Sequence, residues 1–336
     1  MELFNGEKTI FMDGGMGTML QARGLQAGEA PDLWNLSHPE EVQAVHRAYL
    51  EAGSQWISTN TFGTNAKKLA QTGKSVSEIV QAAVDCAKRA AQDYDAKILL
   101  DVGPLGTMLE PMGTLAFEDA YRLFQEVVCA GEKAGVNGVL FETMTDLYEV
   151  RAAVLAAKES TSLPIWVSMS FESNGRTFCG TPVAAFAITA QSLGADAVGI
   201  NCSLGPKEIL PMAKTLCEHT DLPVFIKANA GLPDPSTGEY SLQAKEYAEE
   251  MQEYLPLGLN AVGGCCGTTP DYIRALTQVF SEKRAPKAPK ARKSMVCSGM
   301  NVVEIDGLTV IGERINPTGK PRMKEALRAH SMDYLM

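Results

Sequence analysis

The chain has 336 residues, of which 45% are hydrophobic and 21% are charged, and its formal net charge is −10. These proportions are ordinary for a globular protein, and the length allows either one large barrel or two domains. The acidic balance gives no electrostatic support for a nucleic-acid partner.

The sequence points neither to a membrane nor to an oxidising compartment. Residues 1–8 are polar and lack the apolar core of a signal peptide. No apolar run is long enough to span a bilayer. The eight cysteines are spread through the whole chain, which is not the pattern of a disulfide framework. We therefore expect a cytoplasmic protein with reduced thiols.

Strand-like apolar runs alternate with helix-like stretches through most of the chain. Strands are predicted at residues 9–12, 56–62, 97–102, 138–143, 164–171, 197–202, 223–229 and 260–265. Helices are predicted at residues 39–52, 75–94, 117–134, a stretch ending near 159, 182–193, 206–219, 242–254 and 270–280. Eight strand-then-helix units match a (β/α)₈ TIM barrel in number and size. The alternative is an open doubly wound sheet, which usually has fewer strands.

The composition changes after residue 281. Residues 282–293 are basic and rich in Pro and Ala, which indicates an extended linker, with a solvated tail as the alternative. Residues 308–319 again resemble an ordered strand, but one strand and one short helix cannot bury a core alone. We expect a barrel over residues 1–283, a linker over 284–303 and the incomplete start of a second barrel over 304–336.

The unusual residues of the sequence gather at the carboxyl ends of the predicted strands, where a TIM barrel forms its active site. These residues are Asp13, Gly14 and Gly15 after the first strand, Asn60 after the second, Glu142 in the fourth, Cys202 in the sixth, Asn229 in the seventh, and Cys265 and Cys266 in the eighth.

The most distinctive of these stretches contains Cys265 and Cys266 between glycines. Both sulfur atoms can meet one ion only if the backbone turns there, and the glycines permit that turn. With Cys202 the pair would give three thiolates and an open fourth position, as in a catalytic zinc site. The pair could also be buried inert thiols, a strained vicinal disulfide, or half of a redox motif, although the C-x-x-C spacing is absent.

Three thiolates suit one kind of zinc chemistry better than another. A zinc ion with three cysteine thiolates carries a net charge of −1, and a substrate thiolate makes it −2, so the centre is a poor Lewis acid for hydrolysis. Zinc nevertheless deprotonates a bound thiol, and electron-rich neighbours leave that sulfur nucleophilic. The pattern therefore favours alkyl transfer to a thiol over hydrolysis.

Two acidic residues are candidates for holding an amino acid. Asp13 could pair with its ammonium group while the amides of Gly14 and Gly15 take its carboxylate, although the same residues could form only a tight turn. Glu142 could assist at the ammonium group, or it could be an ion-paired rim residue. The histidines have no metal-ligand spacing, and His46 is expected on a helix surface.

At these residues the chain resembles the homocysteine S-methyltransferase family over roughly residues 4–283. The resemblance rests on the motifs at residues 13–18, 59–62, 141–143, 199–203 and 263–267. It implies a barrel in which zinc, bound by Cys202, Cys265 and Cys266, activates homocysteine. It also implies amino-acid binding at Asp13 with the following backbone and at Glu142, while Asn229 matches a side chain that can occupy zinc's fourth position. Asn60, at the end of the second strand, is a further candidate for substrate binding.

The tail suggests a subfamily and a methyl donor. Residues 311–319 resemble the first strand of the folate-binding barrel of cobalamin-dependent methionine synthases, which follows the homocysteine module in that family. The implied donor is methylcobalamin derived from 5-methyltetrahydrofolate and carried by a cobalamin- or folate-binding module on another part or chain. S-methylmethionine and betaine are alternative donors, and a non-catalytic zinc- or homocysteine-binding module is an alternative function.

Overall fold

The computed structural model describes residues 7–234, 238, 240–282, 284–285, 294–310, 312 and 316–331. The chain forms two compact units. The first comprises residues 1–291 and 297–302, and the second comprises residues 292–296 and 303–336.

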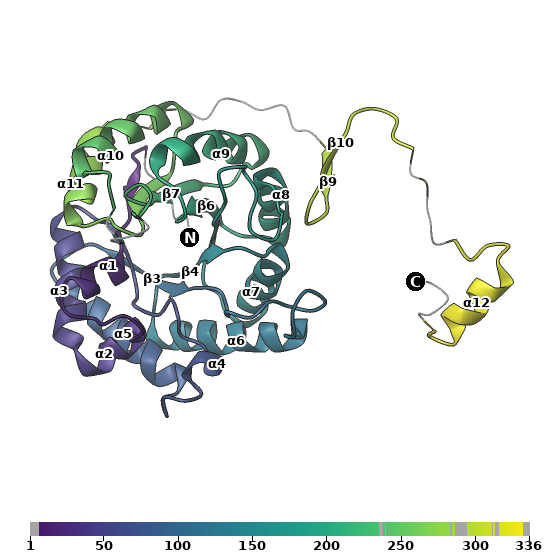
Figure 1. The fold of residues 1–336 in the computed structure, drawn as a ribbon, viewed down its shortest axis with the longest axis horizontal. Helices are drawn as coiled ribbons and strands as arrows, with labels where there is room; N and C mark the ends of the chain where they lie inside the picture. The colour runs from purple at the N-terminus through teal and green to yellow at the C-terminus, as the bar shows by residue number, and fades with distance from the viewer. Residues whose placement is uncertain are drawn as a thin grey trace. The chain divides into compact units, whose positions relative to one another are not determined.

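The first unit is a nearly closed barrel of eight parallel strands with helices on its outside (Figure 1). The strands follow the sheet order β1-β8-β7-β6-β5-β4-β3-β2, and a bridge between Met12 and Trp56 joins the two edges. Their bounds are β1 Ile10–Phe11, β2 Trp56–Ser58, β3 Lys97–Val102, β4 Gly138–Met144, β5 Ile165–Met169, β6 Ala197–Asn201, β7 Val224–Ala228 and β8 Ala261–Gly264. The predicted α/β barrel is confirmed, and the open-sheet alternative is wrong.

The helices cover the outside of the barrel and begin and end at recognisable signals. Ser75 accepts a hydrogen bond from the Glu78 amide and so begins α5, while Gly135 ends α6 with φ of 80°. The helices are α1 Met16–Gln21, α2 Trp34–Ser37, α3 Pro39–Glu51, α4 Ala66–Leu69, α5 Val76–Ala90, α6 Phe117–Ala134, α7 Leu147–Ser160, α8 Val183–Leu193, α9 Pro206–His219, α10 Ala244–Met251 and α11 Pro270–Val279, with 3₁₀ turns at Pro31–Leu33 and Gln252–Leu257. Among the described residues, no helix combines the length and the apolar composition needed to cross a bilayer.

The inside of the barrel is layered. An apolar layer includes Trp56, Leu99, Leu140, Trp166 and Phe225, and the rings of Trp56 and Trp166 stack 4.7 Å apart. Successive side chains of a strand alternate between its two faces, so the residue two positions further along also points inward. Those next positions are occupied by buried polar or charged residues: Ser58, Asp101, Glu142, Ser168 and Lys227. A polar layer therefore lies on an apolar floor, toward the carboxyl ends of the strands.

The chain after residue 293 differs from what the sequence predicted. Strands β9 Ser294–Cys297 and β10 Val302–Ile305 pair with each other, although most of this stretch was expected to be linker. Helix α12 spans Pro321–Arg328. The described residues of the predicted strand at 308–319 show no strand, and residues 311 and 313–315 lie outside the described part of the chain. The start of a second barrel at 304–336, and the domain boundaries that go with it, stay predictions.

Candidate metal and substrate site

A cavity of about 480 Å³ opens at the carboxyl ends of the strands. The predicted residues that line it are Asp13, Gly14, Gly15, Asn60, Glu142, Cys202, Cys265 and Cys266. Asn229 is not among the lining residues. The structure thus brings together the residues of five strand ends that lie far apart in the sequence.

The three cysteines converge at one side of this cavity. Their sulfur atoms all lie within 4.8 Å of one another, and the Cys202 and Cys266 sulfurs are 3.8 Å apart. Zinc with bonds of about 2.3 Å to tetrahedrally placed sulfurs requires a sulfur–sulfur separation of roughly 3.8 Å. The triad therefore has the ligand type and the spacing to hold zinc.

The backbone turns sharply at Cys202 and just after the Cys265–Cys266 pair. Cys202 and Ser203 have φ of 62° and 61°, and Gly267, just after the cysteine pair, has φ of 77°. A non-glycine residue with such φ is uncommon and persists only where its surroundings hold it. Here the Cys202 amide donates to the Lys227 carbonyl (3.2 Å) and the Cys265 amide donates to the Ala228 carbonyl (2.8 Å).

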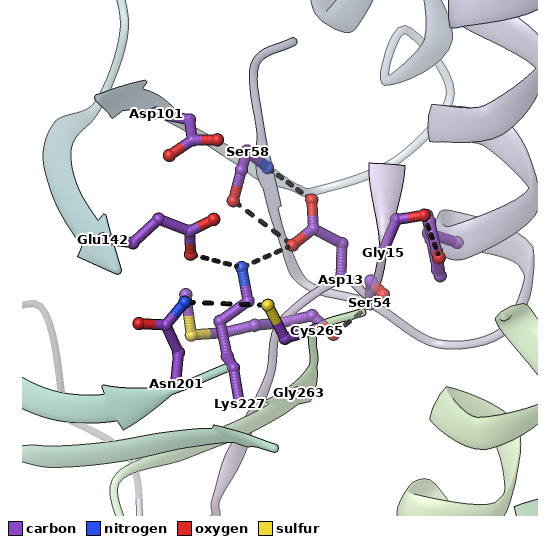
Figure 2. A network of polar contacts seen from close by, with 12 residues as sticks. Asp13, Gly15, Ser54, Ser58, Asp101, Glu142, Asn201, Lys227, Gly263 and Cys265 are labelled. Carbon is purple, nitrogen blue, oxygen red and sulfur yellow. Dashed lines mark hydrogen bonds and ion pairs between the residues drawn. The ribbon is translucent and has the colours of Figure 1, made fainter. Parts of the chain in front are cut away.

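Two asparagines orient the cysteines. The Asn229 Oδ1 accepts a hydrogen bond from the Cys266 amide at 3.1 Å. The Asn201 Nδ2 lies 3.7 Å from the Cys265 sulfur, and this contact is drawn as a dashed line in Figure 2. Asn229 thus supports the cysteine pair from outside the cavity. Asn201 was not predicted as a site residue.

The pKa values of the Cys202 and Cys266 thiols are raised, so these thiols ionise less readily than a free cysteine. For Cys202, the hydrogen bond with Cys265 lowers the pKa, but the hydrogen bond with Cys266 and burial raise it, to about 11. For Cys266, the hydrogen bond with Cys202 lowers the pKa, but the hydrogen bond with Cys265 and burial raise it, to about 12. A metal ion that binds these sulfurs must therefore displace protons from them, so metal affinity rises with pH.

A buried ion cluster lies beside the triad. The Lys227 Nζ is 3.0 Å from Glu142 Oε2 and 3.4 Å from Asp13 Oδ1 (Figure 2). Burial lowers the pKa of Lys227, but Glu142 and Asp13 outweigh burial and raise it well above its usual value. Asp13 also accepts hydrogen bonds from the Ser58 amide (2.6 Å) and the Ser58 hydroxyl (3.2 Å). Both predicted carboxylates are therefore already paired with a lysine that sequence reasoning missed.

The other predicted substrate residues have structural contacts of their own. The Gly15 amide donates to Thr268 Oγ1 at 3.2 Å, and a Cβ on Gly14 would lie 2.6 Å from the same oxygen. Gly14 is therefore required by close packing as well as by the cavity. The Asn60 Nδ2 donates to the Pro31 carbonyl at 2.7 Å, which ties together two loops at the rim.

Two further ionisable residues depart from expectation. Asp101 lines the cavity and was not predicted. His46 was expected on the surface of its helix, and that prediction is wrong, since the side chain is fully buried. Neither ring nitrogen of His46 has a hydrogen-bond partner among the described residues. Burial lowers its pKa to about 4.

Comparisons with known proteins agree with this geometry. A family model described as homocysteine S-methyltransferase matches residues 10–280. The chain is 30% identical over 359 residues to a methionine synthase of Mycobacterium leprae (strain TN), and 30% identical over 354 residues to one of Mycobacterium tuberculosis (strain ATCC 25618 / H37Rv). Each match covers 98% of this chain and 29% of the relative, so the chain spans under a third of these relatives' length.

Solved structures are similar in fold. The metallated form of the homocysteine methyltransferase MmuM from Escherichia coli superposes with a TM-score of 0.68 at 23% identity, covering 81% of this chain and 96% of that one. Its apo form gives a TM-score of 0.67 at 22% identity, covering 82% of this chain and 98% of that one. At such identities the likeness supports the barrel fold alone.

Proposed function

The chain belongs to the homocysteine S-methyltransferase family, and we propose from this premise that it methylates the thiol of homocysteine at a zinc ion bound by Cys202, Cys265 and Cys266. The observation that carries the proposal is the separation of the three sulfur atoms, which would let the three cysteines hold one zinc ion at the wall of the cavity. When bound, zinc would supply the acidity that keeps the substrate sulfur ionised and nucleophilic.

The residues of the chain position the reactants around that centre. Asn201 and Asn229 fix the cysteines through the contacts to Cys265 and Cys266. The amino-acid end of homocysteine would lie against Asp13, Gly14, Gly15, Asn60 and Glu142, which line the same cavity as the triad. Holding the thiol and the amino-acid end in one cavity would orient the sulfur for attack on the donor methyl group, in line with the bond between the methyl group and its carrier; that bond breaks and its electron pair leaves with the carrier.

We propose methylcobalamin as the methyl donor, carried by a module outside residues 1–336. The support is the extent of the match to methionine synthases. A match over 98% of this chain must include residues after 283 as well as the barrel. The matches to the solved homocysteine methyltransferase cover 81% and 82% of the chain.

Metal analysis and a methyl-transfer assay test the proposal. We expect about one zinc per chain and methionine formation from homocysteine with methylcobalamin. S-methylmethionine and betaine serve as alternative donors in parallel reactions. Zinc and homocysteine binding without transfer from any of the three donors would contradict catalysis and favour a binding module.

A variant and a matched control test whether the three cysteines bind the metal. Cys265→Ala should lose zinc and turnover while the barrel stays folded. Cys129→Ala changes a thiol that, like Cys265, is partly exposed and free, but that lies in α6 away from the cavity. This control should keep both zinc and turnover. Full zinc and turnover in Cys265→Ala would show that the metal assignment is wrong.

A further inference from the structure

Two of the three cysteine sulfurs have a hydrogen-bond donor at the end of β6. The Asn201 Nδ2 lies 3.7 Å from the Cys265 sulfur (Figure 2). The Ser203 backbone amide donates to the Cys202 sulfur. A cysteine that binds a metal ion is a thiolate, which accepts hydrogen bonds and has no proton to donate. Both contacts therefore place a donor on a sulfur of the triad.

The Tyr240 side chain supplies a donor to the third sulfur. Its hydroxyl group forms a hydrogen bond with the Cys266 sulfur. Its ring lies against Gly267, where a Cβ would come within 2.2 Å of the ring Cγ. Gly267 also has φ of 77°, so the turn after the cysteine pair and the close approach of the ring both require glycine there. Each sulfur of the triad thus has one donor.

The position of Tyr240 is fixed by contacts within the protein. The side chain is partly buried and packs against the hydrophobic core. Its backbone forms a bridge with Pro233. Two residues further on, the Leu242 amide donates to the Ala230 carbonyl at 3.2 Å, and the Tyr272 hydroxyl donates to the Leu242 carbonyl at 2.6 Å. The hydroxyl group of Tyr240 is therefore placed at the cysteine pair without help from a substrate.

A hydrogen bond to a thiolate makes that sulfur less reactive toward an alkyl group. The negative charge on the sulfur falls as the new bond to carbon forms, so the donor stabilises the thiolate more than the transition state. A thiolate stabilised in this way is less basic and less nucleophilic. Asn201, Ser203 and Tyr240 are not among the residues that line the cavity. A substrate sulfur that reaches the metal from the cavity therefore has none of these three donors.

We propose that Tyr240 directs the methyl group to the substrate, because its hydrogen bond keeps the Cys266 thiolate less nucleophilic than the substrate sulfur. Asn201 and the Ser203 amide do the same for Cys265 and Cys202. This inference rests on the proposed function, in which the substrate thiolate and three cysteine thiolates meet at one metal ion. A methyl group transferred to a cysteine would convert that thiolate into a thioether and so damage the metal site.

Alkylation of the zinc-loaded full chain with methyl iodide, in the absence of homocysteine, tests this role. A cysteine sulfur forms a bond to the methyl carbon, the carbon–iodine bond breaks, and iodide leaves with the electron pair. Mass spectrometry of peptides, with fragment ions to separate Cys265 from Cys266, gives the methylation rate at each cysteine. Tyr240→Phe removes only the hydroxyl group and should methylate Cys266 roughly tenfold faster than wild type, as expected for one lost hydrogen bond to a charged acceptor. The rates at Cys202 and Cys265 should stay unchanged.

Tyr272→Phe is the matched control. The Tyr272 hydroxyl donates to the Leu242 carbonyl, so this variant also removes one tyrosine hydroxyl close to Tyr240, but one whose acceptor is an oxygen. It should keep the wild-type methylation rate at Cys266. Zinc content and thermal midpoint show that each variant keeps its metal and its fold. Tyr240→Leu, which also lacks the hydroxyl group, is the second variant if Tyr240→Phe does not keep its zinc.

The outcomes separate this inference from the proposed function. If wild type holds zinc and Tyr240→Phe methylates Cys266 at the wild-type rate, the inference is overturned alone. Equal acceleration at all three cysteines would also overturn it, because a loosened metal site rather than one lost donor would then be the cause. Loss of zinc from both Tyr240 variants would overturn it as well, since the residue would then serve metal retention. If wild type holds no zinc, the proposed function and this inference fail together.

Discussion

Replacing Lys227 by methionine removes the cation that balances two buried carboxylates. The Lys227 side chain is 3% exposed, and those of Asp13 and Glu142 are 3% and 10% exposed. At separations of 3.4 Å and 3.0 Å, each attraction amounts to about 5 kcal/mol with an effective dielectric constant of about 20. Desolvation offsets much of this attraction in the intact cluster, but the variant keeps the buried carboxylates and loses their cation.

We expect Lys227→Met to lower the free energy of unfolding by roughly 3–5 kcal/mol at pH 7, as found when one partner of a buried ion pair is removed. Urea unfolding of the purified protein measures this change. The loss should shrink as the pH falls toward 5, because Asp13, whose pKa is raised by burial, then takes up a proton in the folded state. Adding Glu142→Gln to Lys227→Met should restore part of the stability.

An exposed pair provides the control for this prediction. Lys245 Nζ lies 3.8 Å from Glu249 Oε1, and the lysine side chain is 88% exposed. Lys245→Met should change the unfolding free energy by less than about 1 kcal/mol. A loss of that small size in Lys227→Met as well would refute the view that Lys227 compensates the buried carboxylates.

Two more predictions concern His46 and the second unit. Because burial lowers the pKa of His46 to about 4 from its usual 6.5, the unfolded chain binds a proton more readily than the folded one, and stability should fall by about 3 kcal/mol as the pH drops from 6.5 to 4. In urea unfolding across this range, His46→Leu should remove that part of the pH dependence, and an unchanged pH profile would contradict the burial of a neutral ring. A protein ending after Val302 loses only residues of the second unit, and it should keep its zinc and its thermal midpoint within about 2 °C, because Leu308 and Val310 of the removed segment are 97% and 87% exposed and bury little. Differential scanning calorimetry would show a larger drop if the removed segment stabilises the barrel.

The sequence predicts the barrel well because parallel strands buried on both faces appear as short apolar runs. All eight runs became strands; four of them are one or two residues shorter than predicted, two are shorter by three or four residues, one has the predicted length and one is a residue longer. The same burial on both faces makes the charged residues inside the barrel hard to predict from the sequence. In a strand that is apolar on both faces, alternation cannot say which side chains point into the barrel, so Asp101 in residues 97–102 and Lys227 in residues 223–229 gave no directional signal.

The burial of His46, by contrast, could have been predicted from the sequence. In α3 the buried residues are Val42, Val45, His46, Tyr49 and Leu50, which is the spacing of one helix face. His46 therefore lies on the apolar face of α3. The prediction of a surface position relied on its polar side chain and was wrong. The described residues of 308–319 lack a strand for another reason, since an apolar run becomes a strand only when a neighbouring strand satisfies its backbone.

Asn201 shows how the barrel couples the sulfur site to the carboxylate cluster. Its Oδ1 accepts from the Thr143 amide (2.9 Å) and from Ser168 Oγ (2.8 Å), while its Nδ2 donates to Thr143 Oγ1 (2.8 Å) and contacts the Cys265 sulfur (3.7 Å). Thr143 has φ of 60°, a strained conformation that such contacts hold in place. Since Thr143 directly follows Glu142, one side chain from β6 fixes both Cys265 and the strand end that carries Glu142. The distance between the triad and the carboxylates is therefore set by the rigid sheet, and a substrate that reaches both must match a fixed length.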